Sequence, residues 1–305
     1  MPRSKTAVVY SLALGVAVFA SGAPLTSASA QEPQTGTLTE IIPGHYLYNA
    51  GFQNAGVIVT DEGALVVDGL NSEARGQHVR QLISETTGQP VRYLVSSTFH
   101  NNFTRGNAAY DDVIKIGQEL HRADLAALME EDNEPLDERA PRLTDVTYSD
   151  HMTLYLGGKE IQIIHIGPAH TRGDSLVYVP EDRIVYVSEL LFYDRFPWMN
   201  TGYVNWIDAI DRILEMDVDI VVPGQGHENM FSVGFPGDSR QKLMNFRQVL
   251  VDARDDVQSA IDRGATEEEA VASVLLSEYQ DLGSYDQQRE IVVRRTYQDL
   301  QGTLE

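Results

Sequence analysis

The sequence of 305 residues contains no cysteine. Disulfides, thiol nucleophiles and thiolate zinc ligands are therefore excluded, and histidine, carboxylate, amide and hydroxyl groups remain for metal binding or catalysis. Positive charge is also scarce, because 23 Lys and Arg residues stand against 45 Asp and Glu residues and give a net charge of −22. A field of this sign repels phosphate backbones and anionic lipid surfaces. We therefore expect neither a nucleic acid nor a membrane as partner, and the sequence leaves the oligomeric state open.

The N-terminus holds the one long apolar run of the sequence. Arg3 and Lys5 precede this run over residues 7–20, and small residues follow up to Ala30. The order predicts an export signal over residues 1–30 with cleavage after Ala30, since the alternative, a membrane anchor, needs about 20 apolar residues. The signal holds two basic side chains and no acidic one, so the processed chain would carry a net charge of −24. We expect a periplasmic or secreted protein.

Two strand-rich blocks follow. Residues 45–68 alternate as strands around an acidic turn, and residues 72–86 have apolar side chains at helical spacing. Residues 146–191 repeat the order strand, acidic turn, strand, carboxylate. This order predicts an α+β fold in which mixed β-sheets are covered by helices on the outside. Further strands are predicted at residues 91–95, 113–116 and 220–222, and a further helix at residues 118–131.

The C-terminal third is predicted to be helical. Apolar residues at three- and four-residue spacing form one face of a long helix that ends at Gly264, and Thr266 and Glu269 form a capping box for the next helix. Helices are also expected at residues 208–216 and 285–300. We therefore divide the chain into a signal peptide (1–30), a main domain (31–235) that includes a solvated surface loop (131–141), and a C-terminal helical extension packed on the same domain (236–305).

Polar clusters follow four of the apolar strands, at residues 98–107, 167–174, 188–189 and 223–228. Functional side chains gather on loops that a rigid framework holds. The first cluster is similar to a loop of the metallo-β-lactamase superfamily, in which a strand is followed by His-x-His-x-Asp-His and then by Gly-Asn. The Gly-Asn pair is kept at residues 106–107. The four ligand positions carry, in order, Thr98, His100, Asn102 and Phe103.

The other clusters continue this resemblance, which spans about residues 45–228. The segment Gly-Pro-Ala-His-Thr-Arg-Gly-Asp at residues 167–174 keeps the next ligand of the family as His170. Glu189 stands where the family has a bridging Asp, and its side chain is one methylene longer. Gln225 is in register with the last His of the family, and His227 follows two residues later. Residues that resemble supporting groups, and are expected to orient the ligands, are Asp68, Asp174 and Gln225.

The resemblance implies a four-layer αβ/βα sandwich and a reduced metal site. Of about seven ligands for two ions, His100, His170 and Glu189 remain, with His227 as a candidate fourth. Two imidazoles and one carboxylate suffice for one Zn²⁺ or another divalent metal, and we expect their ligating atoms within about 4 Å of each other. The same resemblance implies a small-molecule substrate and hydrolysis of its ester, lactone or amide bond. Glu189 would move protons, and a donor group would stabilise the oxyanion, either Thr98 or Asn102.

Each of these residues has a structural alternative. The two histidines could be hydrogen-bonded side chains at strand ends, and His227 could face solvent. A salt link among His100, His170 and Glu189 would favour a non-catalytic relative that keeps the fold and binds a ligand or partner without metal. Aromatic residues after Glu189 could belong to the core, but Phe196 and Trp198 are expected to line an apolar substrate pocket.

Overall fold

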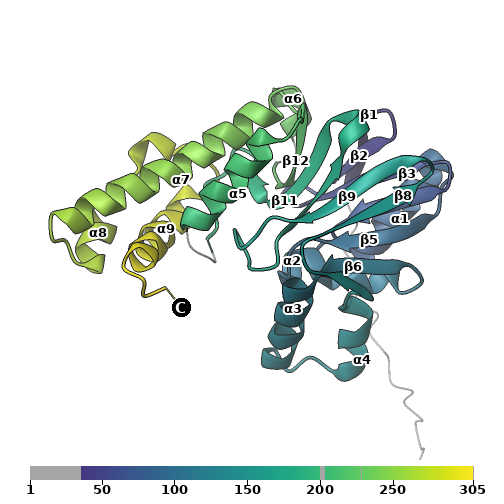
Figure 1. Cartoon of the computed structure of the whole chain (residues 1–305), viewed down its shortest axis with the longest axis horizontal. Helices are drawn as coiled ribbons and strands as arrows, with labels where there is room; N and C mark the ends of the chain where they lie inside the picture. The colour runs from purple at the N-terminus through teal and green to yellow at the C-terminus, as the bar shows by residue number, and fades with distance from the viewer. Residues whose placement is uncertain (1–35, 200–202, 228, 305) are drawn as a thin grey trace, which may run out of the picture. The chain divides into compact units, whose positions relative to one another are not determined.

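The computed structural model describes residues 36–199, 203–227 and 229–304 (Figure 1). All of them belong to one compact unit. The predicted signal peptide lies outside the described residues. Within the described part of the chain, no helix combines the length and the apolar character needed to cross a membrane.

Seven strands form the first sheet, in the same order as in the sequence. The first four pair antiparallel, and β4 to β7 pair in parallel. The strands are β1 (Thr37–Ile42), β2 (His45–Asn49), β3 (Asn54–Thr60), β4 (Gly63–Val67), β5 (Val91–Ser96), β6 (Ile114–Gln118) and β7 (Val146–Tyr148).

Five strands form the second sheet, in the order β12-β11-β10-β9-β8. Its strands pair antiparallel, except that β11 and β12 are parallel. The strands are β8 (His151–Leu156), β9 (Lys159–His165), β10 (Ser175–Val179), β11 (Ile184–Phe192) and β12 (Ile220–Gln225).

Helices connect and cover the sheets. The α-helices are α1 (Glu73–Thr87), α2 (Asn101–Thr104), α3 (Glu119–Glu131), α4 (Leu136–Arg139), α5 (Tyr203–Glu215), α6 (Met230–Val233), α7 (Ser239–Asp262), α8 (Glu267–Ser273) and α9 (Tyr285–Leu300). Short 3₁₀ helices are η1 (Arg105–Tyr110), η2 (Ala140–Arg142), η3 (Pro180–Asp182) and η4 (Ser277–Tyr279).

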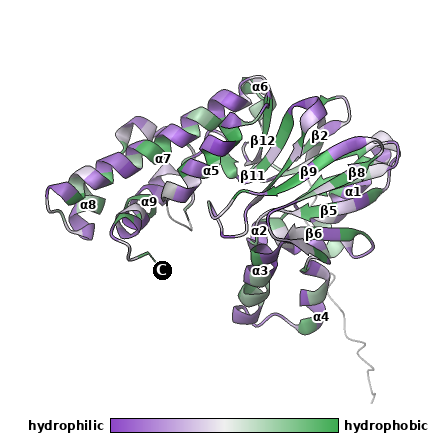
Figure 2. Cartoon of the chain, in the orientation of Figure 1, coloured by the Kyte–Doolittle hydropathy of each residue, from purple (hydrophilic) through white to green (hydrophobic). Residues whose placement is uncertain are grey.

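Strand alternation produces the layers, because successive side chains of a strand point to opposite faces. In β4, Leu65 packs between the two sheets, whereas Val66 packs on the outer face with residues of α1. In β11, Tyr186 packs between the sheets and Val187 packs outward with α5, α7 and α9. Hydrophobic residues accordingly concentrate along central strands such as β9, β11 and β12 (Figure 2). The result is helix, sheet, sheet, helix, the four-layer arrangement that the sequence predicts.

Several predicted elements are confirmed. Helix α1 begins after Ser72, whose hydroxyl accepts from the backbone N–H of Arg75, and α9 has the predicted bounds. The capping box of Thr266 and Glu269 opens α8. Three predictions need correction: β1 was not expected, α5 begins at residue 203 instead of 208, and the stretch 131–141 contains α4 and the start of η2.

Candidate metal centre

Three elements bring the candidate ligands to one place. His100 follows the end of β5, His170 lies in the loop between β9 and β10, and Glu189 lies within β11. A β-bulge precedes Glu189 in β11. The register of β11 against β12 shifts on both sides of Ser188, and Ser188 has a left-handed φ of +47°. Such bulges often re-aim a side chain next to a site.

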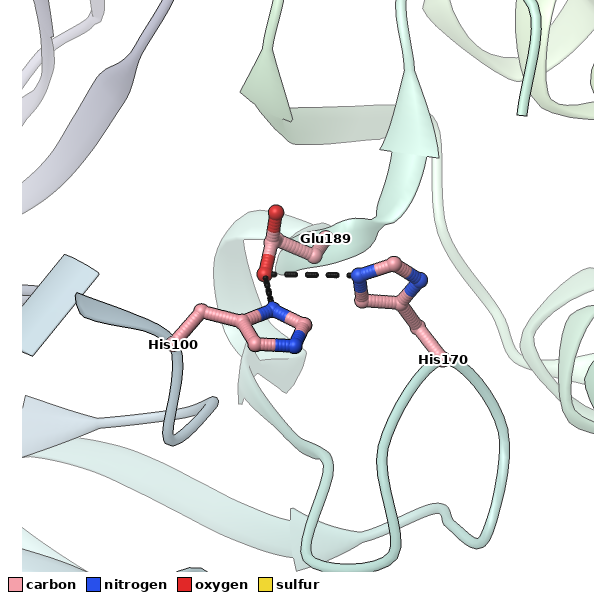
Figure 3. A group of neighbouring side chains, drawn as sticks. All are labelled: His100, His170 and Glu189. Carbon is pink, nitrogen blue, oxygen red and sulfur yellow. Dashed lines mark hydrogen bonds and ion pairs between the residues drawn. The ribbon is translucent and has the colours of Figure 1, made fainter. Parts of the chain in front are cut away.

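The three side chains point toward one another (Figure 3). Glu189 Oε2 lies 2.5 Å from His100 Nδ1 and 3.5 Å from His170 Nε2. One ligand atom of each residue lies within 4.8 Å of the others, somewhat wider than the expected separation. His170 and Glu189 are 1% and 3% exposed. The sequence therefore identified a cluster that the fold assembles from three distant segments.

The proximity of these groups shifts the pKa values of Glu189 and His100. Burial raises the pKa of Glu189, but the two imidazoles outweigh burial and hold the pKa of this carboxyl well below its usual range. Burial lowers the pKa of His100, but the charge and hydrogen bond of Glu189 outweigh burial, so the pKa of His100 is raised. Each shift favours the charged form of its group, so the carboxylate and the imidazole stabilise each other's charge.

The donor set fits one divalent ion. Two imidazole nitrogens and a carboxylate oxygen are the protein ligands of several catalytic zinc sites. Ligand atoms on a tetrahedral zinc lie about 3.3 Å apart, so Glu189 Oε2 and His100 Nδ1 would have to separate by about 1 Å. A rotation of the long Glu189 side chain can supply this movement.

Gln225 and Thr98 both contact the carboxylate of Glu189. Gln225 Nε2 donates to Glu189 Oε1 at 2.6 Å. Thr98 Oγ1 donates to Glu189 Oε2 at 3.4 Å, and Thr98 is only 1% exposed. The prediction of Thr98 as an oxyanion donor is therefore corrected, because its hydroxyl faces Glu189 from inside the protein.

Two buried aspartates support the surrounding backbone. Asp68 Oδ1 accepts from the backbone N–H of Ser97 at 2.9 Å, and Asp68 Oδ2 accepts from the hydroxyl of Ser188 at 2.6 Å. Asp68 thus ties the end of β5 to the bulge in β11. Burial raises the pKa of Asp68 to about 6, although these hydrogen bonds oppose the shift. Asp174 accepts from the backbone N–H of Thr171 at 2.6 Å and so closes the loop that carries His170.

His100, His170 and Glu189 line a pocket of about 310 Å³. Its aromatic lining residues are Phe52 and Trp198, and Asn102 lies among its polar ones. Trp198 is 41% exposed and lines this pocket. Phe196 requires correction: it is fully buried and packs edge-on against Tyr285 of α9, so it belongs to the core.

His227 also departs from its predicted role. Its Nε2 lies 3.8 Å from Asp194 Oδ2 and its ring packs against Tyr193, so it does not join the cluster. The offset of two residues from Gln225 carries His227 past the cluster, where it is partly buried instead of facing solvent. Sequence reasoning missed Phe52, because only the pairing of its turn with the end of β12 brings it to the pocket.

Residues 48–225 match the model of the metallo-beta-lactamase superfamily, more than half of the chain. The chain belongs to the metallo-beta-lactamase superfamily. The metallo-beta-lactamase of Pontibacter korlensis superimposes with a TM-score of 0.56 at 19% identity, over 71% of this chain and 99% of that one. The predicted family and fold class are thereby confirmed.

Two other proteins are similar. The stereoselective inverting sec-alkylsulfatase Pisa1 of Pseudomonas sp. superimposes with a TM-score of 0.68 at 15% identity, over 87% of this chain and 50% of that one. At such identities the likeness concerns the fold. The 2,4-dinitroanisole O-demethylase subunit alpha of Nocardioides sp. (strain JS1661) is 29% identical over 79 residues, 25% of this chain. The match spans only 24% of that curated relative.

Proposed function

We propose that this protein is a metal-dependent hydrolase with a single divalent ion, which cleaves an ester, lactone or amide of a small molecule. The observation that carries the proposal is the convergence of His100, His170 and Glu189 in a pocket. Members of the superfamily typically bind divalent metals such as zinc. A zinc ion held by these three residues would polarise a substrate carbonyl and favour the attack of water near neutral pH.

We assign separate roles in the reaction to Gln225, Glu189 and Asn102. Gln225 holds Oε1 of Glu189 and leaves Oε2 toward the two histidines. Glu189 is the only carboxylate among the described lining residues, so we assign proton transfer to it. Asn102 lines the pocket and carries an amide N–H that can donate to the carbonyl oxygen of a substrate.

Metal content tests this proposal directly. Protein purified without chelator should contain close to one equivalent of zinc or another divalent metal by elemental analysis. His170→Gln should lower the content at least about tenfold, because one of three ligands is lost. His151→Gln is the matched control, since His151 is exposed and lies outside the cluster. Less than about a tenth of an equivalent in the unmodified protein would exclude the hydrolase.

A second candidate function is a metal-free relative that binds a ligand without catalysis. One observation favours it: Glu189 already pairs with both histidines and accepts from Gln225, so its carboxylate has partners without a metal. Thermal unfolding separates the two candidates. A metal that binds only the folded state at 100 times its Kd stabilises it by about 2.7 kcal/mol. We expect EDTA to lower the Tm of the hydrolase, whereas the second candidate predicts the same Tm with EDTA and with added Zn²⁺.

We also propose that the chain is exported and acts in the periplasm or outside the cell. The support is the basic, apolar and small-residue order of residues 1–30. Expression of the full sequence in a bacterium and N-terminal sequencing of the recovered protein test this proposal. The expected mature protein begins at Gln31. Recovery of the intact sequence from the cytoplasm alone would contradict it.

A further inference from the structure

Two partly exposed aromatic side chains share the pocket with the candidate metal ligands. Phe52 comes from the turn between β2 and β3, and Trp198 follows the end of β11. They lie far apart in the sequence and the fold brings them to the same cavity. Exposed aromatic surface beside convergent polar groups is typical of a site that binds an apolar ligand group.

Phe52 is fixed in its position before any ligand binds. The backbone N–H of Gly226 donates to the Phe52 carbonyl at 3.1 Å, which joins the turn to the end of β12. The guanidinium of Arg195 lies 4.3 Å from the centre of the Phe52 ring. Arg195 in turn donates to the hydroxyl of Ser284, just before α9. Because these contacts already hold Phe52, little conformational entropy is lost there when a ligand binds, and its ring can contribute to affinity.

The described lining residues offer no unpaired charge to the ligand. None of them is Lys or Arg, and Glu189 is the one carboxylate. Gln225 binds Oε1 of Glu189, and the two histidines pair with Oε2. An ion buried without a partner loses more hydration than it regains. Arg195 contacts the Phe52 ring, but it lines a different cavity. A charged group placed against Phe52 and Trp198 would therefore bind poorly.

We propose that Phe52 and Trp198 form the binding wall for the non-reacting part of the substrate, and that this part is flat, apolar and uncharged. The ligand's status as a substrate rests on the proposed hydrolase function. Its binding to the wall does not require a metal. The chemistry that fits is an uncharged aryl or alicyclic ester, lactone or amide, with its carbonyl toward the three-residue cluster.

A matched pair of fluorescent probes tests the charge preference. N-phenyl-1-naphthylamine is neutral, and 8-anilino-1-naphthalenesulfonate has the same rings with a sulfonate added. We expect the full chain to bind the neutral probe with a Kd at least about tenfold lower than that of the anionic one. Trp198→Ala and Phe52→Ala should each weaken neutral-probe binding at least about tenfold, and Phe52→Leu should weaken it less because it stays apolar.

Tyr155→Ala is the control, since Tyr155 is 70% exposed on β8 and does not line the pocket. It should leave both affinities unchanged. Equal or tighter binding of the anionic probe, absence of neutral-probe binding, or insensitivity to Trp198→Ala would overturn the inference. Metal analysis decides the proposed reaction separately. Protein without metal that still binds the neutral probe at Trp198 would refute the hydrolase and leave the binding wall in place.

Discussion

Asp68 is a buried carboxyl that links two strands of the site, and burial raises its pKa from 3.8 to about 6. A carboxyl with a raised pKa binds its proton more readily in the folded state. Its contribution to stability is therefore complete below pH 3.8 and is lost as the pH rises through about 6. We expect Asp68→Asn to remove this dependence, since Asn keeps the acceptor oxygen and tolerates the left-handed φ of +72°.

Urea unfolding of the two proteins from pH 4 to pH 7 measures the effect. As the pH rises from 4 to 7, the unfolding free energy of the unmodified protein should fall by up to about 3 kcal/mol relative to that of the variant. This figure is the difference between a pKa of 3.8 and one of about 6, taken at 1.36 kcal/mol for each pKa unit. Asp61→Asn is the control, because Asp61 lies in the exposed turn between β3 and β4. A constant difference between Asp68→Asn and the unmodified protein over this range would show that Asp68 has an ordinary pKa.

The loop after β5 has lost its ligands at Thr98, Asn102 and Phe103, and of these three Asn102 lines the pocket, so it is the best residue of this loop at which to rebuild metal affinity. Asn102→Asp adds a carboxylate, which divalent metals bind more tightly than an amide. We expect the Kd for Zn²⁺ to fall at least about tenfold, measured by competition with a chromophoric chelator. Asn101→Asp is the matched control, since Asn101 accepts from Arg142 outside the pocket. Equal zinc affinity in both variants would contradict the alignment of this loop with the family.

Single residues show what the sequence could and could not predict. His100, His170 and Glu189 were predicted from their spacing in the family frame, because a frame fixes which residue follows a strand end. Phe196 and Trp198 are two residues apart on an irregular segment, and only tertiary packing decides that one is buried and the other lines the pocket. A local pattern contains no such information.

Among the elements, η1 and the loop before α1 approach each other unusually closely. The backbone N–H of Gly106 donates to the Leu70 carbonyl at 2.9 Å, and a Cβ on Gly106 would lie 1.8 Å from the Gly69 carbonyl oxygen. Backbone atoms cannot yield as a flexible side chain can. Gly106→Ala should therefore cost at least about 3 kcal/mol, the upper end for overpacking.

Chemical unfolding checks this value, with Gly237→Ala as the control. A Cβ on Gly237 would meet only the Gly234 carbonyl oxygen, at 3.5 Å, which is an ordinary contact. Its effect should stay within about 0.5 kcal/mol. A loss of less than about 1 kcal/mol in Gly106→Ala would mean that η1 can shift away from the loop.

At the same scale, helices were predicted more fully than edge strands. Apolar side chains at helical spacing and the Ser72 cap predicted α1, and α9 was predicted with its observed bounds. β1 was missed because its side chains are half-exposed or exposed throughout, so it lacks a buried alternating face. Its pairing with β2 supplies the stability that its own sequence does not indicate.

The whole molecule carries an excess of 22 negative charges, and this excess should make the Tm depend on salt concentration. Mutual repulsion destabilises a compact state, and salt screens it, because the Debye length falls from about 30 Å at 0.01 M to about 3 Å at 1 M. Salt also weakens attractive pairs such as Arg183 with Asp219, but exposed pairs contribute little. The repulsion should therefore decide the sign of the salt effect on stability, and we expect the Tm to rise with NaCl.

Thermal unfolding at increasing NaCl concentration measures this effect. For a chain of this size each 1 kcal/mol of unfolding free energy corresponds to a change in Tm of about 2–4 °C. KCl should act equally, since screening depends on ionic strength, and a Tm that falls or stays constant in both salts would show that paired charges outweigh the net field.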